Sequence, residues 1–374
     1  MTILIDLREL SWKCGKYAPG KNNAITDVPG VSVGHTTIIE GEGRLIPGKG
    51  PIRTGITVVI PHEGNIFREK VPAGVFVANG FGKSTGIPQI NETGFIETPI
   101  AITNTLNVGL VFDALVSHAI SKNPEIGITT STVCPIVTEC NDGYMNDLQG
   151  RHVKELHVIE AIKNAKLNSK IEQGCVGAGT GMSVFGLKSG VGTASRQLII
   201  NQGNYKGTYH VGILAVPNYG EFEDFQFYGN NMVNILDKDK YFRRIRKKKN
   251  DKPDGGSIIV LIATDLPLNN RQLNRIARRG TLGIAQTGSI MTHTSGDFIF
   301  AFSTKNRIEH FSGETIKSEI CFNDMNLLLS DIFRMTVDAV QEAIYNAMLF
   351  SKTMIGRDDN IRVALDPNDL PEPS

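Results

Sequence analysis

Residues 254–263 read Asp-Gly-Gly-Ser-Ile-Ile-Val-Leu-Ile-Ala, so a small nucleophile leads directly into an unbroken apolar run. Such a run is typical of a strand that is buried on both faces. The preceding residues, 237–254, are charged and rich in turn formers. Ser257 therefore stands where an exposed connection becomes a core strand. Because Gly256 has no Cβ and tolerates strained φ and ψ angles, the Gly256–Ser257 peptide bond is a candidate for self-cleavage.

On both sides of this strand the sequence mixes strand and helix patterns. Short apolar runs bounded by Gly and Pro predict strands at 56–61, 72–79, 196–202, 208–216, 257–264 and 298–303. Apolar residues at helical spacing predict helices at 106–121, 152–166, 269–279 and about 327–350, with Gly280 as the stop of the third. No repeat of 20–50 residues is visible. A layered α/β sandwich is the class that fits this mixture.

The composition is that of an ordinary globular protein, with 374 residues, 40% hydrophobic and 21% charged. The net charge of +1 gives no general reason to expect a nucleic-acid or membrane partner. The five cysteines form no C-x-x-C pair and no zinc spacing, so we expect free thiols and no metal site. The N-terminus lacks the apolar region of a signal peptide, and no run approaches the ~20 residues of a membrane span. We therefore expect a cytoplasmic protein.

Motifs for nucleotide and nucleic-acid binding are incomplete. Gly82-Lys83-Ser84 resembles the end of a P-loop, but the first glycine of that pattern would fall at Val77. Residues 177–181 resemble a dinucleotide loop, but Met182 stands where the last glycine belongs. The basic residues within 243–249 lack a recognisable nucleic-acid motif and favour a solvated loop. We expect no cofactor.

Three polar clusters accompany Ser257. Residues 291–297 read Met-Thr-His-Thr-Ser-Gly-Asp, residues 141–147 read Asn-Asp-Gly-Tyr-Met-Asn-Asp, and residues 217–220 read Pro-Asn-Tyr-Gly. Taken singly, each is explained at least as well by a turn whose side chains bond their own backbone.

Taken together and in this order, the clusters resemble the L-aminopeptidase D-Ala-esterase/amidase family of self-processing serine peptidases, which includes β-peptidyl aminopeptidases. The resemblance is nearly full length. It is carried by blocks at 22–31, 33–37, 97–105, 142–144, 177–182, 256–257, 278–279, 295–297 and 353–358.

The resemblance implies a four-layer α-β-β-α sandwich, layered like N-terminal-nucleophile hydrolases but connected differently. It implies one compact domain, 1–374, made as a precursor. Cleavage between Gly256 and Ser257 would give an α chain of residues 1–256 and a β chain of residues 257–374. The αβ units of the family form oligomers, commonly tetramers.

The catalytic groups follow from the same resemblance and from the chemistry of serine. A serine hydroxyl needs a base, and cleavage would give Ser257 its own α-amine, whose ordinary pKa is about 7.7–8.0. The family pattern adds Ser295 and an acid two residues later, here Asp297. On an extended segment both side chains point to the same face, so Asp297 could orient Ser295, which could relay the proton of Ser257. Many relatives carry glutamate at the acid position, and aspartate is one methylene shorter. Both bases remain open.

Tyr144 and Asn218 match the transition-state stabilisers of the family. Loss of one such donor typically costs about 2.7–4 kcal/mol. The substrate should carry a free amino group, because the family trims N-terminal residues from short peptides, amides and esters. Glu139 and Asp142 are candidates to hold that ammonium, although either could equally serve as a turn or surface acid.

Three alternatives compete with this interpretation. A Ser–His–acid triad could use His293 or His35. A related self-cleaving acyltransferase would transfer acyl groups to an amine, but that group typically has threonine at the junction, where this chain has Ser257. A non-catalytic binding protein could keep the same fold.

Overall fold

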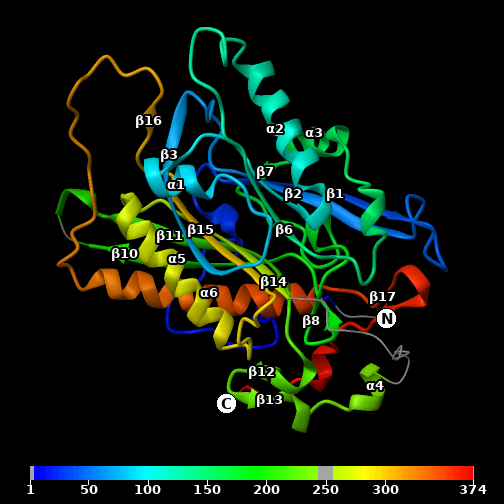
Figure 1. The fold of residues 1–374 in the computed structure, drawn as a ribbon. Helices are drawn as coiled ribbons and strands as arrows, with labels where there is room; N and C mark the ends of the chain where they lie inside the picture. The colour runs from blue at the N-terminus through cyan, green and yellow to red at the C-terminus, as the bar shows by residue number, and fades with distance from the viewer. Residues whose placement is uncertain (1–3, 202, 243–255, 374) are drawn as a thin grey trace.

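The computed structural model describes residues 4–201, 203–242 and 256–373. The basic cluster at 243–249 lies outside these residues. Two sheets stack face to face and helices cover their outer faces (Figure 1). Among the described helices, none is long and apolar enough to cross a membrane.

The smaller sheet has five strands in the order β6-β5-β2-β1-β7. Their bounds are β1 Ser32–Glu40, β2 Ile52–Ile60, β5 Ile100–Asn104, β6 Ile136–Cys140 and β7 Lys166–Leu167. Two helices pack on its outer face, α2 Val108–Lys122 and α3 Glu155–Lys163 (Figure 1).

The larger sheet has seven strands in the order β10-β11-β14-β15-β3-β16, with β4 paired to β3. Their bounds are β3 Glu69–Gly80, β4 Phe95–Ile96, β10 Gly192–Ile200, β11 Gly207–Asn218, β14 Ser257–Thr264, β15 Gly296–Ser303 and β16 Ile308–Glu309. Helices α5 Asn270–Ala285 and α6 Leu328–Leu349 pack on its outer face (Figure 1).

The remaining elements are short and lie around the sandwich. They are α1 Ile87–Thr93, α4 Lys238–Phe242 and three two-stranded ribbons, β8 Ser183–Val184 with β9 Leu187–Lys188, β12 Gln226–Phe227 with β13 Asn230–Asn231, and β17 Met354–Ile355 with β18 Ile361–Arg362.

The alternation of side chains along β14 shows why the molecule has four layers. Ile258, Val260 and Ile262 lie in the core that the large sheet shares with α5 and α6, whereas Ile259 and Leu261 lie in the core between the two sheets. Successive residues of a strand point to opposite faces, so an unbroken apolar run fills two cores at once. A third core lies under α2 and α3. The expected α-β-β-α sandwich is confirmed.

The predicted elements are present, with shifted ends. Helix α5 begins with a capping box between Asn269 and Gln272. It continues past Gly280 to Ala285, so Gly280 does not end the helix. A Cβ on Gly280 would lie 3.0 Å from Ile299 Cγ2 of β15. The glycine therefore allows close packing of the helix on the sheet, and the prediction of a stop was wrong.

Strand β11 extends to Asn218, two residues beyond the predicted end. The extension has a consequence for the site, because Asn218 then lies opposite Ser257 in the antiparallel pair β11–β14. On the other side, Ser257 lies opposite Gly296 in the parallel pair β14–β15. The candidate nucleophile thus begins a central strand, with a neighbour on each side.

Candidate active site

The Ser257 side chain is buried, with 4% of the residue exposed. Its Oγ makes no hydrogen bond of ordinary geometry to any residue that the structure describes. It interacts with the thiol of Cys140, at the end of β6 in the opposite sheet, where burial raises the thiol pKa and Ser257 opposes that rise. The Cys140 thiol itself donates to the Val216 carbonyl at 3.1 Å. Ser257 therefore faces the layer between the sheets.

The Gly256 carbonyl, at the bond expected to be cleaved, accepts a hydrogen bond from the Gly296 N–H at 3.0 Å. A donor at this place polarises the carbonyl and would stabilise negative charge on its oxygen. A Cβ on Gly256 would lie 3.0 Å from Tyr219 Cβ and 3.3 Å from Ser295 Oγ. Glycine is therefore the residue that fits without displacing its neighbours.

Ser295 and Asp297 form a buried pair in which Ser295 Oγ donates to Asp297 Oδ1 at 2.6 Å. Burial raises the pKa of Asp297 to about 6, and the hydrogen bond from Ser295 opposes the rise. The other carboxylate oxygen, Oδ2, has no hydrogen-bond partner among the described residues. This carboxyl is thus poised to change protonation state near neutral pH.

Ser295 lies on the side of Gly256 where a Cβ would project. Because side chains alternate, the Ser257 side chain points to the other face. In agreement with this, Ser257 Oγ makes no hydrogen bond to Ser295 in this structure. The relay from Ser257 through Ser295 stays a prediction, and it requires a rotation of the Ser257 side chain or a movement of its backbone.

The Asn218 amide is held at both ends. Its Nδ2 donates to the Asn141 carbonyl at 2.7 Å, and its Oδ1 accepts from the Ser183 N–H at 3.0 Å. These contacts fix which end of the amide is the donor. An amide nitrogen has two hydrogens, so one remains for a second acceptor.

The loop that carries Tyr144 is held by the segment that follows α6. Arg357 Nε donates to the Gly143 carbonyl at 2.5 Å, and Asn360 Nδ2 donates to the Tyr144 carbonyl at 2.8 Å. The Arg362 guanidinium stacks on the Tyr144 ring, with Cζ 3.5 Å from the ring centroid. The loop thus precedes the expected cleavage site in the sequence, and the residues that hold it in place follow that site.

Glu139 and Asp142 differ in their surroundings. Glu139 accepts from the Lys83 N–H at 3.0 Å and from the Thr105 hydroxyl, and a Cβ on Gly82 would lie 3.3 Å from its Oε1. Gly82 in turn lies against Gly296, since a Cβ on Gly296 would come within 2.8 Å of the Gly82 backbone. Glu139 thus lies next to Gly82, and Gly82 packs against Gly296, which pairs with Ser257.

Asp142 uses one carboxylate oxygen toward strand β2 and the other inside its own turn. It accepts from the Thr54 hydroxyl at 2.5 Å and from Asn146 Nδ2 at 3.0 Å. Burial raises its pKa to about 7. These contacts suit a residue that shapes the loop of Tyr144, and they leave Glu139 as the better-placed candidate for an ammonium group.

Residues 23–362 match the model of peptidase family S58. The chain belongs to peptidase family S58. It is 38% identical over 358 residues to β-peptidyl aminopeptidase BapA of Sphingosinicella xenopeptidilytica, covering 94% of this chain and 86% of that protein.

Solved structures agree with this membership. The PH0078 protein of Pyrococcus horikoshii OT3 superposes with a TM-score of 0.88 at 47% identity, covering 98% of this chain and 97% of that one. The L-aminopeptidase D-Ala-esterase/amidase of Ochrobactrum anthropi, described as a prototype for the serine aminopeptidases and a variant of the Ntn hydrolase fold, superposes with a TM-score of 0.85 at 32% identity, covering 97% and 96%.

Membership of family S58 makes the chain a hydrolase, a serine aminopeptidase or amidase of a self-processing family. The acyltransferase and the binding protein are therefore not favoured. The histidine triad finds no support in the geometry. His293 is exposed, and His35 is partly buried, with its Nδ1 2.9 Å from Thr57 Oγ1. Burial lowers the pKa of His35 to about 4, so this imidazole is neutral.

Four residues that lie beside the candidate site residues were not singled out as site residues in the sequence, namely Cys140, Ser183, Gly296 and Arg362. They sit beside the quoted motifs, but their contacts join segments far apart in the chain, and no local pattern marks them. Among the described residues, no group of three or more His, Cys, Asp or Glu is arranged to hold a metal ion.

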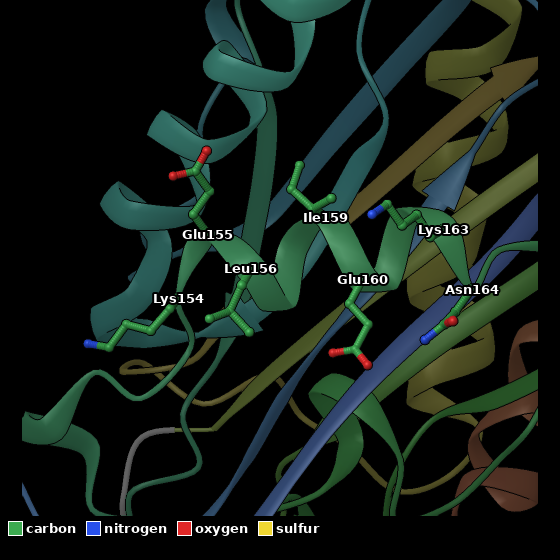
Figure 2. Close-up of a pocket in the computed structure, with 7 residues that line it drawn as sticks. All are labelled: Lys154, Glu155, Leu156, Ile159, Glu160, Lys163 and Asn164. Carbon is green, nitrogen blue, oxygen red and sulfur yellow. The ribbon is translucent and has the colours of Figure 1, made fainter.

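A surface hollow of about 610 Å³ on α3 is separate from this site (Figure 2). It shares no residue with the surroundings of Ser257, and it is lined by Lys154, Glu155, Leu156, Ile159, Glu160, Lys163 and Asn164.

Proposed function

We propose that the Ser257 hydroxyl performs two reactions, cleavage of its own Gly256–Ser257 bond and then the release of N-terminal residues from short peptides, amides or esters. The observation that carries the proposal is the place of Ser257 at the start of a central strand, with Asn218 opposite on one side and Gly296 on the other. A nucleophile and two sources of N–H donors meet there.

In the maturation step, Ser257 Oγ attacks the Gly256 carbonyl carbon. The Gly296 N–H, which already donates to the Gly256 oxygen, stabilises the negative charge that develops. Collapse of this intermediate breaks the C–N bond and leaves an ester to Ser257 with a free α-amine. Water then hydrolyses the ester and releases the α chain, 1–256, from the β chain, 257–374.

In the turnover step, the same hydroxyl attacks the substrate carbonyl carbon. Either the new α-amine or Ser295, oriented by Asp297, takes the proton. The bond to the leaving amine or alkoxide then breaks as that group takes up a proton, which leaves an ester to Ser257. Water hydrolyses this ester, releases the N-terminal residue and restores the hydroxyl. Tyr144 and Asn218 donate to the oxyanion. Glu139 holds the substrate ammonium, which explains a preference for free N-termini.

The substrate class follows from the named relatives. Relatives at 38% and 39% identity are β-peptidyl aminopeptidases, so we propose that short peptides beginning with a β-amino acid are among the substrates of this chain. We propose further that residues 1–374 form one domain, that αβ units assemble as an oligomer, and that the enzyme works in the cytoplasm. All five cysteines are free, which suits a reducing compartment.

The test is intact mass spectrometry of the wild type and of Ser257→Ala, followed by an assay on aminoacyl and β-aminoacyl p-nitroanilides. Division of 40.8 kDa in the ratio of 256 to 118 residues predicts wild-type fragments of about 28 and 13 kDa. Ser257→Ala should stay at full length and inactive. An active wild type that stays at full length would refute the proposed maturation.

A further inference from the structure

Cys140 connects the end of the small sheet to the strand that lies beside Ser257. Its thiol donates to the Val216 carbonyl of β11 at 3.1 Å, and the carbonyl of the next residue, Asn141, accepts from Asn218 Nδ2 at 2.7 Å. Asn218 lies opposite Ser257 in the antiparallel pair β11–β14. These contacts therefore bring the end of β6 beside the start of β14.

The Cys140 and Ser257 side chains meet between the two sheets. Ser257 and Ile259 point to the same face of β14, because side chains alternate along a strand, and Ile259 lies with Cys140 in the core between the sheets. Cys140 is fully buried. The Ser257 hydroxyl interacts with the Cys140 thiol, and it makes no hydrogen bond of ordinary geometry to any described residue.

The thiol can hold the Ser257 hydroxyl, but it cannot take the proton. The thiol hydrogen is used for the Val216 carbonyl, so the sulfur faces Ser257 as an acceptor. Burial raises the pKa of the Cys140 thiol, so the group stays protonated at neutral pH and is not a base. Ser295 lies on the other side of the backbone, where a Cβ on Gly256 would project. The hydroxyl must therefore leave the sulfur before Ser295 can receive its proton.

We propose that Cys140 is a positioning residue, which holds the Ser257 hydroxyl at rest between the sheets and, because sulfur is a weak acceptor, lets it leave for each attack. This inference rests on the proposed function. An oxygen atom accepts a hydrogen bond from a hydroxyl more strongly than a thiol sulfur does. Oxygen in place of this sulfur should therefore stabilise the resting position and slow both reactions of Ser257.

The experiment compares Cys140→Ser with Cys140→Ala, because the two new side chains differ only in the hydroxyl that can accept from Ser257. The first measurement is the rate of self-cleavage after unprocessed protein is refolded. The second is kcat and KM of the mature enzyme on a β-aminoacyl p-nitroanilide. Cys14→Ser is the matched control, because Cys14 is also buried and its thiol lies 3.7 Å from Gln341 Oε1 of α6, on the outer face of the large sheet.

Cys140→Ser should lower the rate of self-cleavage and kcat by about three- to tenfold, the range expected when one hydrogen bond holds the resting state more firmly. KM should stay unchanged, because the resting contact is present with and without substrate. Cys140→Ala should cleave itself and turn over substrate at least as fast as wild type. Cys14→Ser should match wild type in both measurements.

Equal slowing in the two Cys140 variants would show that the size of the side chain matters and not its acceptor. An unchanged rate in Cys140→Ser, or an equal loss in Cys14→Ser, would also overturn the inference, and all three results leave the proposed function intact. If Cys140→Ser does not fold, Cys140→Ala decides alone, since any rate below that of wild type contradicts a holding role. A wild type that neither cleaves itself nor hydrolyses the substrate would instead refute the proposed function.

Discussion

At the residue scale, Ser257 is buried, but its hydroxyl is held only weakly by its neighbours. A buried hydroxyl without a partner typically costs about 1–3 kcal/mol. Within residues 4–201, 203–242 and 256–373, the Ser257 hydroxyl has no hydrogen-bond partner of ordinary geometry, and it acts on the thiol of Cys140, a weak hydrogen-bonding group. The hydroxyl therefore loses little when it leaves its resting position. A nucleophile that must first turn toward its own carbonyl and later toward a substrate benefits from that freedom.

Asp297 gives the first prediction, because its pKa can be tested in maturation. Before cleavage the nitrogen of Ser257 is part of a peptide bond and cannot act as a base, so Asp297, through Ser295, is the titrating group. Since burial raises its pKa to about 6, the rate of self-cleavage should fall as pH drops through about 6. The measurement is the fraction cleaved against time, after unprocessed protein is refolded at a series of pH values.

The variants for this prediction are Asp297→Asn and Asp297→Glu. The amide should cleave slowly with no dependence on pH near 6, whereas the carboxylate of Asp297→Glu should keep the dependence. If the wild-type rate does not change between pH 5 and pH 7, Asp297 has no part in the step.

The same raised pKa has a consequence for stability. The folded state binds the Asp297 proton more tightly than the unfolded state, whose carboxyl titrates near 3.8, so this group makes the protein less stable as pH rises from about 3.8 to about 6. Asp297→Asn should therefore raise the melting temperature at pH 7 but not at pH 3.5. An equal effect at both values would mean that another group is responsible.

At the element scale, a glycine in a strand allows a helix to pack closely on the sheet. A Cβ on Gly192 of β10 would lie 1.9 Å from the Ala343 carbonyl and 2.6 Å from the Ala347 nitrogen of α6. Gly192→Ala should force α6 away from the sheet and cost about 1–3 kcal/mol. Thermal unfolding measures the loss.

Gly207 is the matched control, because it lies at the far end of the same strand pair and its nearest contact for a Cβ is 3.8 Å away. Gly207→Ala should change the melting temperature little. Equal losses in both variants would show that the close approach of α6 is not what requires glycine at position 192.

The length and apolar pattern of each element explain whether the sequence could predict it. Strands β14 and β15 and helix α6 carry long apolar patterns, so their identity was clear without a structure. Strand β6 was not predicted, because its run Ile-Val-Thr-Glu-Cys contains two polar residues that are buried only through specific contacts, such as those of Glu139 with Lys83 and Thr105. The position of Arg362 could not be predicted either, because its contact with Tyr144 joins two residues that are separated by more than half of the sequence.

For the site itself, the sequence pointed to the candidate nucleophile, the Ser295–Asp297 pair and the two candidate stabilisers, because the blocks of a known family carry them. It did not supply their orientation. Side-chain direction depends on how the strands are placed: Ser295 lies on the side of Gly256 where a Cβ would project, whereas the side chain of the next residue, Ser257, points to the other face.

At the scale of the whole molecule, cleavage at Gly256 would leave two chains that share one sheet. Strand β14, the first of the β chain, pairs with β11 of the α chain, and β15 of the β chain pairs with β3 of the α chain. The two chains should therefore co-elute in native size-exclusion chromatography and separate only in denaturant. Separation without denaturant would show that this pairing is too weak to hold them.

A buried ion pair strengthens this association. Glu342 of α6 accepts from Arg196 at 2.6 Å and from Arg8 at 2.8 Å, so the β chain would be tied to two arginines of the α chain. Glu342→Gln leaves a buried guanidinium without its counter-charge, which typically costs about 3–5 kcal/mol. The denaturant midpoint should fall accordingly.

Glu319→Gln is the comparison for Glu342→Gln, because it breaks an exposed pair with Lys317 at 2.9 Å. Its effect should be small, since exposed pairs contribute about 0–1 kcal/mol. Equal midpoints for the two variants would mean that the buried pair does not hold the chains.

The alternation of β14 between two cores also limits how the length of this chain can change. A residue gained or lost inside β14 would move every later side chain of the strand to the opposite layer and place apolar groups where the pairing does not fit them. Charged residues upstream of Gly256 are under no such restriction from the strand. Among homologous proteins, length differences should therefore collect before the glycine, and none should fall between the nucleophile and the end of its strand.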